Sequence, residues 1–370
     1  MKKVDDACIT HLFDDAIFLR HYSHFIRTFF KQDRHEFITN ASGDYCITSS
    51  NNDYGANIVT FVRSEEIRNP LRFIKRTIQT LREMDKSKLI IIHSFTDIDL
   101  LYFCISPHLL KKTVWIIWGY DLYDYRLRKS SISSNVRFFV KRRLVKKIPY
   151  VISNAGDYKL LQKWYGTSPK LLQVYSLYGN GCTNVKPHIR QTNAGTINIL
   201  LGNSSTLTNR HIEGLDILSK YKNEDIKIHI PLSYGDKEYA KSVEKHAREI
   251  FGDKVIILDK MMSPESYNDF LSTMDIAVFN HNRQQGVGNL TYMFQSGVKI
   301  FLNDDNPLCE YYAELNLPVN SINNIPEMSF DEFIYINPSD IQASTQRAQE
   351  IFSEETLVKQ WNEVFALAKK

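Results

Sequence analysis

The stretch at residues 280–290, Asn-His-Asn-Arg-Gln-Gln-Gly-Val-Gly-Asn-Leu, combines a cation, two glutamines and two glycines. It lies between an apolar run at 274–279, typical of a buried strand, and a segment at 291–297 that reads as a short helix. The first N–H groups of a helix have no partner within it, and glycines let another group come close to the main chain. Arg283 adds a planar cationic fork. The stretch therefore predicts an anion site, with a helix that begins near Asn289 directing its positive end at the charge.

A second polar loop, Gly-Asn-Ser-Ser-Thr-Leu-Thr-Asn-Arg-His, starts at Gly202 directly after a predicted strand. Gly202 permits a tight turn, and Asn209 suits the cap of the next helix, although a plain turn would look the same. Loops that follow strands of one parallel sheet share its carboxyl edge, where ligands of such sheets bind. We expect the two loops to hold a phosphorylated ligand together. Neither carries the Gly-Lys-Ser/Thr ending of a P-loop or a full GxGxxG fingerprint.

Polar and aromatic residues also follow strands predicted in the first half of the chain. Trp118, Gly119, Tyr120 and Asp121 come just after the apolar run at 114–117. Aromatic rings stack on sugars and carboxylates bind hydroxyls, but core packing explains the aromatic rings equally well. His93 ends another predicted strand, where it is a candidate general base or a structural residue.

Asp97-Ile98-Asp99 is a DxD sequence, which holds a divalent metal in some glycosyltransferases. Here it begins a predicted helix, where acidic side chains favour the helix dipole. We therefore expect no metal and no cofactor. The five cysteines, at 8, 46, 104, 182 and 309, show no metal-binding spacing and predict no disulfide framework.

The stretch at 126–147 carries nine Lys or Arg residues and no acidic residue, with apolar residues interleaved. Such asymmetry indicates a partner. Nucleic acid is one candidate, but no helix-turn-helix, RRM or zinc-finger pattern accompanies the charge. An amphipathic surface that binds anionic lipid fits better. The residues expected to contact the membrane are Arg137, Lys141, Arg142, Arg143, Lys146 and Lys147.

The whole chain has 370 residues, 43% of them hydrophobic and 24% charged, which suits two globular domains. Strand-like and helix-like segments alternate in both halves, and this alternation favours parallel sheets. We predict an α/β fold with two doubly wound domains and a cleft between them: residues 1–186, a linker at 187–195, residues 196–345, and a helix at 346–370 that packs back on the first domain. The absence of a long apolar run and of a signal-peptide core predicts a cytoplasmic protein.

Four segments carry a resemblance to a known family: WGYDLYDYR, LLGNSSTLTNRH, IPLSYGDKEY and RQQGVGN…QSGVKIFLNDDNP. In this order and spacing they are similar to the TDP-N-acetylfucosamine:lipid II N-acetylfucosaminyltransferase family of enterobacterial common antigen synthesis. The similarity is clearest from Val114 to Leu308 and faint over the first 90 residues. Asn289 stands where the family tends to have a small hydroxyl residue.

The resemblance implies a glycosyltransferase of GT-B type, with two Rossmann-like domains, peripheral at the cytoplasmic face of the membrane. It implies transfer of 4-acetamido-4,6-dideoxygalactose from a dTDP donor to a polyprenyl-diphosphate-linked saccharide. The implied catalytic residues are His93, Asp121 and Arg283. Those implied for the donor are Gly202, Asn203, Ser204, Tyr234, Gln284, Gln285, Gly286 and Gly288, and Gly119 is implied for the acceptor. From their positions after predicted strands we also expect Asn289 at the donor, and Trp118 and Tyr120 at the acceptor.

The sequence leaves three alternatives open: a GT-B enzyme that uses a UDP- or GDP-sugar, a non-catalytic protein that binds nucleotide sugars, and a nucleic-acid-binding protein. His93 and Asp121 argue against the non-catalytic class, and the two phosphate loops argue against the nucleic-acid class.

Overall fold

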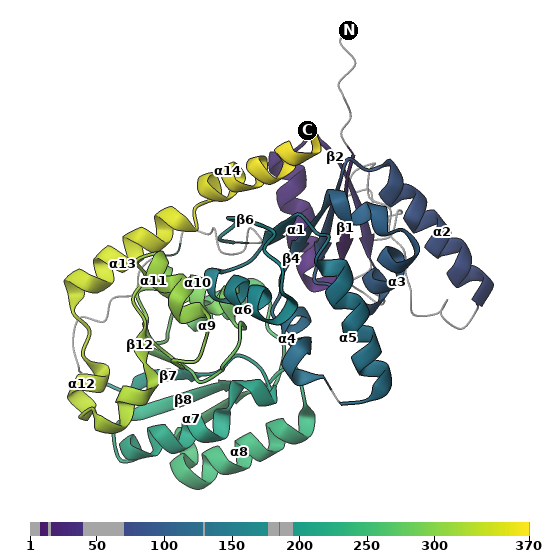
Figure 1. Cartoon of the computed structure of the whole chain (residues 1–370). Helices are drawn as coiled ribbons and strands as arrows, with labels where there is room; N and C mark the ends of the chain where they lie inside the picture. The colour runs from purple at the N-terminus through teal and green to yellow at the C-terminus, as the bar shows by residue number, and fades with distance from the viewer. Residues whose placement is uncertain are drawn as a thin grey trace. The chain divides into compact units, whose positions relative to one another are not determined.

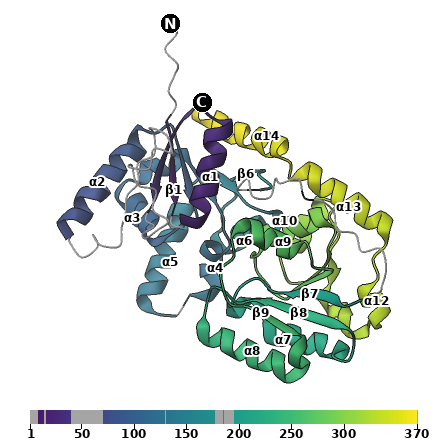
Figure 2. The ribbon, with the colours of Figure 1, turned by 180° about the vertical axis from the view of Figure 1, so that it is seen from behind.

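The structure, a computed structural model, describes residues 8–13, 16–39, 70–128, 130–176, 185 and 195–369. The chain forms two compact units. Unit 1 comprises Met1–Asn180 and Glu354–Lys370, and unit 2 comprises Gly181–Ser353. Figures 1 and 2 show the ribbon from two sides, and each unit is described here by itself.

Unit 1 contains a six-stranded parallel sheet in the order β2-β1-β3-β4-β5-β6. Its strands are β1 (Cys8–Phe13), β2 (Arg34–Thr39), β3 (Leu89–His93), β4 (Thr113–Ile116), β5 (Tyr150–Ile152) and β6 (Lys170–Leu172). Its helices are α1 (Ala16–Phe29), α2 (Pro70–Lys86), α3 (Asp97–Ile105), α4 (Tyr120–Leu127), α5 (Ile132–Val145), α6 (Ala155–Tyr165) and α14 (Glu354–Phe365).

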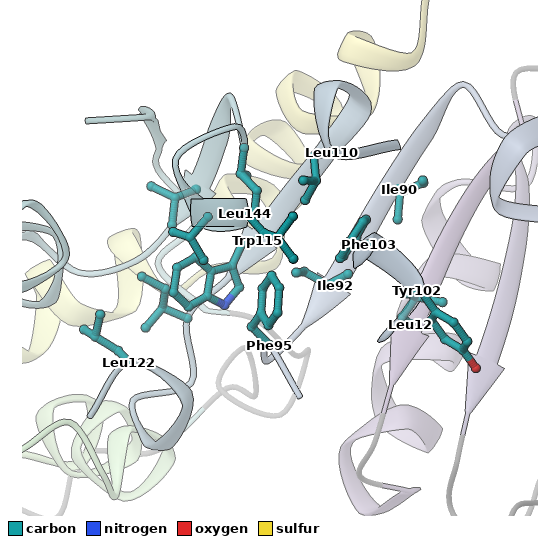
Figure 3. Close-up of a cluster of buried hydrophobic side chains, with 14 of the residues drawn as sticks. Leu12, Ile90, Ile92, Phe95, Tyr102, Phe103, Leu110, Trp115, Leu122 and Leu144 are labelled. Atoms are coloured by element: carbon teal, nitrogen blue, oxygen red, sulfur yellow. The ribbon is translucent and has the colours of Figure 1, made fainter. Parts of the chain in front are cut away.

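Helices cover both faces of this sheet, which explains why its central strands are apolar throughout. On one face, Figure 3 shows Trp115 and Phe95 together, with Leu144 of α5 and Leu122 of α4 close by. On the other face, α1 and α14 pack through Tyr22 and Trp361, whose ring centroids are 5.1 Å apart. The last helix of the chain is therefore part of the core of unit 1.

Unit 2 contains a second six-stranded parallel sheet, in the order β12-β11-β10-β7-β8-β9. Its strands are β7 (Ile197–Leu201), β8 (Ile226–Pro231), β9 (Val255–Leu258), β10 (Ile276–Phe279), β11 (Lys299–Leu302) and β12 (Asn320–Ser321). Its helices are α7 (His211–Leu218), α8 (Lys237–Phe251), α9 (Pro264–Leu271), α10 (Val287–Ser296), α11 (Leu308–Glu314), α12 (Phe330–Ile334) and α13 (Pro338–Ile351). Helix α9 begins with a regular cap, since the side chain of Ser263 accepts from the Ser266 N–H and Pro264 is the first helical residue.

The C-terminal end of the chain differs from the sequence prediction. The single helix expected at 346–370 is two helices that separate at residues 352–353, and only α14 belongs to unit 1. The expected linker lies outside the described residues from 187 to 194. Within the described parts of the chain, no helix is both long and apolar enough to cross a membrane.

Candidate active site

Two polar loops of unit 2 meet at the carboxyl edge of its sheet. β7 pairs with β8 on one side and with β10 on the other, so the strand order reverses between β7 and β10. Ligands of open α/β sheets bind at such a reversal. Gln285, after β10, donates from Nε2 to Oδ1 of Asn203, after β7, over 3.1 Å. The two loops that the sequence assigned to one edge are thus in direct contact.

The contact belongs to a longer chain of hydrogen bonds with a single direction. Arg283 donates from Nε to the Thr208 hydroxyl at 3.0 Å, and Thr208 donates to Oε1 of Gln285 at 2.7 Å. Asn203 then donates from Nδ2 to the Tyr234 hydroxyl at 3.2 Å. Tyr234 follows β8 and is half-exposed. This series of hydrogen bonds joins three loops. The hydroxyl of Tyr234 accepts the last bond, so it can donate its own proton to another group.

Thr208 is a site residue that the sequence analysis missed. Thr208 lies in a run of turn-forming residues, and nothing in the sequence distinguishes it from the other polar residues of this loop as a site residue. Its hydroxyl accepts from Arg283 and donates to Gln285, so it fixes the orientation of both side chains.

Helix α10 begins two residues earlier than expected, at Val287, with Gly286 as its N-cap. Gly286 has φ 65°, and a Cβ there would lie 3.3 Å from Cγ of Asn203. A Cβ on Gly288 would have no heavy atom within 4 Å. Asn289 in the same turn donates from Nδ2 to the Tyr267 hydroxyl at 2.9 Å. The first turn of α10 thus presents its backbone N–H groups beside Gly288, where an anion has room to approach.

The loop after β7 is held by its own side chains. Asn209 accepts from the backbone N–H of Asn203 at 3.2 Å and donates to the Ser204 carbonyl at 2.7 Å. Asn209 therefore braces this loop and does not cap α7, whose N-cap is Arg210. Gly202 has φ 71°, and a Cβ there would lie 2.3 Å from Nε2 of His211. Close packing against His211 thus requires a glycine at position 202.

In unit 1 the strand order reverses between β1 and β3, and His93 is the last residue of β3. Its ring is 2% exposed and stacks on Phe13, with centroids 3.6 Å apart. Among the described residues, His93 Nδ1 and the hydroxyl of Ser94 have no hydrogen-bond partner, although both are buried. Ser94 also has φ 74°, a strained value for a residue with a side chain. Burial holds the pKa of His93 well below its usual value.

Asp121, which the sequence predicts to be catalytic, holds two loops of unit 1 together. It is 1% exposed. Its Oδ2 accepts from the Phe95 N–H at 2.8 Å and from Trp115 Nε1 at 2.7 Å, and its Oδ1 accepts from the Trp118 N–H at 3.1 Å. Three donors stabilise the carboxylate and tie together the loops after β3 and β4.

The three residues expected at the acceptor lie around the start of α4. Gly119 is its N-cap, with φ 91°, and Tyr120 is exposed. Trp118 lies edge-on to Phe13, with centroids 6.2 Å apart. Trp118 is therefore close to the ring that stacks on His93.

The two aspartates of the DxD sequence both have protein partners. Asp99 accepts from the Thr96 N–H and hydroxyl in a capping box at the start of α3, and Asp97 pairs with Arg137. The described residues contain no cluster of three or more His, Cys, Asp or Glu side chains placed to hold a metal.

Two of the six residues expected to contact a membrane bind other parts of unit 1. Lys141 is 5% exposed, and its Nζ donates to the Asp121 carbonyl at 2.7 Å. Arg137 is bound to Asp97 and Asp124 at 2.5 and 3.0 Å. The other four lie exposed on α5 and the turn after it: Arg142, Arg143, Lys146 and Lys147. The sequence could not separate the two groups, because the acidic partners of Arg137 lie on other helices.

Solved structures with the same fold are glycosyltransferases of GT-B type. A glycosyltransferase from Rickettsia africae matches with a TM-score of 0.68 at 10% identity, covering 99% of both chains. A sucrose-phosphate synthase from Thermosynechococcus elongatus matches with a TM-score of 0.68 at 11% identity, covering 97% of this chain and 98% of that one. HepE from Anabaena, in complex with UDP and glucose, matches with a TM-score of 0.66 at 12% identity, covering 97% of this chain and 99% of its own. The predicted fold class, two α/β domains of GT-B type, is confirmed.

The model of one protein family matches residues 7–370, almost the whole chain. Its description is 4-alpha-L-fucosyltransferase, glycosyl transferase group 56. The family expected from the resemblance is confirmed, and with it the class of enzyme. The chain belongs to glycosyl transferase group 56 and is a glycosyltransferase.

Proposed function

We propose that this enzyme transfers 4-acetamido-4,6-dideoxygalactose from a dTDP donor to a polyprenyl-diphosphate-linked saccharide in the synthesis of a bacterial surface polysaccharide. The sugar has a 6-deoxygalactose skeleton, as does the fucosyl group named in the family description. The observation that carries the proposal is the contact between the loops after β7 and β10, which gathers Arg283, Gln285 and Asn203 beside the start of α10.

The donor reacts by losing a nucleoside diphosphate, so negative charge grows on the leaving oxygen as the glycosidic bond breaks. Groups fixed before the reaction stabilise that charge most. In unit 2 these groups are the guanidinium of Arg283, held by Thr208, and the N–H groups of the first turn of α10. HepE, which shares this fold, was solved in complex with UDP and glucose, and this supports a nucleotide-sugar donor.

The acceptor hydroxyl must lose a proton when it attacks the sugar. We assign this proton to Nδ1 of His93 if the reaction inverts the anomeric centre, because this nitrogen is buried at the strand reversal of unit 1 and has no partner among the described residues. In a retaining reaction the same atom would orient the acceptor.

We also propose that unit 1 binds the cytoplasmic face of the membrane through a docking face, defined as Ile132, Val136, Phe139, Arg143, Lys146 and Lys147. The first four are spaced 4, 3 and 4 residues apart, so they share one side of α5. Ile132 is 86% exposed and Phe139 is 54% exposed. Exposed apolar side chains flanked by cations suit an anionic lipid surface.

A thermal-shift panel of dTDP-, UDP- and GDP-sugars, each with and without EDTA, tests the donor site, followed by mass spectrometry of the acceptor. We expect dTDP-sugars to raise the melting temperature equally with and without EDTA, and the acceptor to gain one sugar residue. A shift with UDP- or GDP-sugars alone would favour another donor. Binding with no release of nucleotide would favour the non-catalytic alternative. Loss of binding in EDTA and its return with magnesium would show a metal requirement.

A further inference from the structure

Unit 1 contains a row of three buried histidines, of which the proposed reaction uses only one. His35, His11 and His93 come from the neighbouring strands β2, β1 and β3. His11 Nε2 lies 2.9 Å from His35 Nδ1, and His11 Nδ1 lies 3.3 Å from His93 Nε2. The three imidazoles thus form one continuous hydrogen-bonded row.

The row crosses the sheet diagonally. His35 is in register with Ile9, near the start of β1, and His93 is in register with Phe13, at its end. Ile9, His11 and Phe13 alternate with Thr10 and Leu12, so they share one face of the sheet. Because the strands are parallel, the row joins the amino edge of the sheet at His35 to the carboxyl edge at His93.

Aromatic rings hold the three imidazoles in place. His11 stacks on Phe37 at 4.7 Å, His93 stacks on Phe13 at 3.6 Å, and Phe365 of α14 meets His35 edge-on at 4.7 Å. Burial lowers the pKa of all three histidines, that of His35 to about 4. A positive charge is therefore unfavourable on any one of them, and at neutral pH each ring carries one N–H and one lone pair.

The nitrogens at the two ends of the row are buried. Among the described residues, neither His93 Nδ1 nor His35 Nε2 has a hydrogen-bond partner. In a row of neutral imidazoles each N–H points to the lone pair of the next ring. A proton accepted at one end therefore requires a proton to leave at the other.

This inference rests on the proposed function. We propose that His93, His11 and His35 act as a histidine relay, which carries the proton of the acceptor hydroxyl from the carboxyl edge of the sheet to its amino edge. His93 Nδ1 takes that proton as the oxygen forms its bond to the sugar. The Nε2 proton of His93 moves to His11 Nδ1, and the Nε2 proton of His11 moves to His35 Nδ1. His35 Nε2, which is buried, releases its proton to a water molecule that the relay requires beside it.

The relay explains how a buried histidine serves as a base although burial disfavours its charged form. Each ring gains one proton and loses one, so no imidazolium stays in the core. The negative charge of Asp33, which raises the pKa of His35 against the larger effect of burial, favours the proton at the releasing end. Movement of a proton in the reverse direction, after the product leaves, restores the starting tautomers.

The resting tautomers are measurable without any substrate. We expect 15N NMR of the full chain labelled at histidine to show His93, His11 and His35 neutral at pH 7, each protonated at Nε2. Single His→Asn variants assign the signals. Protonation of the three rings at Nδ1 in the resting enzyme would overturn the relay, since His93 would then have no lone pair for the acceptor proton.

The His35→Asn variant tests the relay in the reaction. Its amide oxygen can accept the bond from His11 but cannot pass a proton on. We expect the single-turnover rate to fall on the order of tenfold or more, with the donor-induced thermal shift unchanged. In wild type the dependence of this rate on the fraction of D2O should be curved, because several protons move, and in His35→Asn it should be linear.

His24→Asn, a change of an exposed histidine on α1, is the matched control and should retain the wild-type rate and curvature. A folded His35→Asn variant with the wild-type rate and curvature would overturn the relay and leave the proposed function intact. If wild type itself transfers no sugar, the proposed function fails and the relay fails with it.

Discussion

Arg283 donates from Nε to the hydroxyl of Thr208 at 3.0 Å, so a loop that follows β7 holds the cation of the loop that follows β10. This bond fixes the guanidinium before any donor binds. Donors fixed in advance stabilise a transition state more than a ground state, because no energy is spent on reorientation during the reaction.

Arg283→Ala is expected to lower kcat by a factor on the order of 10² to 10³, with a smaller change in the KM of the donor, because charge on the diphosphate grows as the bond breaks. Steady-state kinetics and a melting curve on the same preparation check this. Arg248→Ala, on the exposed side of α8, is the control. A variant that melts lower but turns over normally would show that Arg283 only stabilises its loop.

Thr208→Val removes the hydroxyl that orients both Arg283 and Gln285 and keeps the shape of the side chain. We expect kcat/KM to fall about tenfold, the effect of one or two hydrogen bonds, and Thr208→Ser to restore most of it. Thr273→Val, in the turn after α9, removes a hydroxyl that donates to the Phe270 carbonyl, and it serves as the control. Equal losses for Thr208→Ser and Thr208→Val would contradict the orienting role.

Alanine substitutions at Gly286 and Gly288 test whether the diphosphate approaches the main chain at the start of α10. Alanine at 286 is strained by its positive φ and by Asn203, so it lowers stability as well as binding. Alanine at 288 meets no atom within 4 Å apart from its chain neighbours and the nearby backbone of its own helix, and it replaces a glycine in a helix, so the protein should fold with equal or greater stability. We expect Gly288→Ala to weaken donor binding in a thermal-shift titration without lowering the melting temperature of the free enzyme. Unchanged donor affinity would place the diphosphate elsewhere.

The docking face predicts binding to anionic lipid that weakens with salt. Each Lys or Arg near such a surface contributes about 1 kcal/mol. Reversal of Arg143, Lys146 and Lys147 to Glu should therefore release the enzyme from anionic vesicles in a sedimentation assay, and Phe139→Ser should weaken retention further. Reversal of the exposed Lys241, Lys245 and Arg248 on α8 is the control. Equal retention on neutral and anionic vesicles would count against the docking face.

Buried histidines make the stability of the fold depend on pH. Burial lowers the pKa of six of them: His11, His35, His93, His211, His229 and His281. Their ordinary pKa is about 6.5, so as the pH falls from there towards 4 the unfolded chain binds protons that the folded chain does not, and stability is lost. Between pH 7.5 and 5.5 the free energy of unfolding should fall by about 1 kcal/mol per histidine.

Urea midpoints at the two pH values measure this loss. His229→Gln should reduce it, because the amide can keep the bond that joins His229 Nε2 to Asn198 at 3.1 Å but does not titrate in this range. Equal midpoints at pH 7.5 and 5.5 would contradict the prediction.

The sequence predicted the parts of the site that depend on the succession of strand, loop and helix along the chain. Strand followed by polar loop followed by helix is readable at Gly202 and at Gly286, and the strand reversal then brings the two loops together. Contacts between distant segments were not readable. The three partners of the Asp121 carboxylate come from β4 and from the loops after β3 and β4, and the partners of Arg137 lie on α3 and α4. The histidine row was missed for the same reason, since its members are 24 and 82 positions apart and only their register aligns them.

The packing of α14 against α1 affects the order in which the two units can fold during synthesis. Trp361 and Phe365 complete the core around Tyr22 and His35, yet all of unit 2 is translated between them and the first strands. At about 5 to 20 residues per second, the ribosome needs roughly 10 to 35 s for unit 2. During that interval one apolar side of the first sheet has α1 but lacks α14. Unit 2 can therefore reach its folded state first, and the nascent chain exposes a surface on which a chaperone would act.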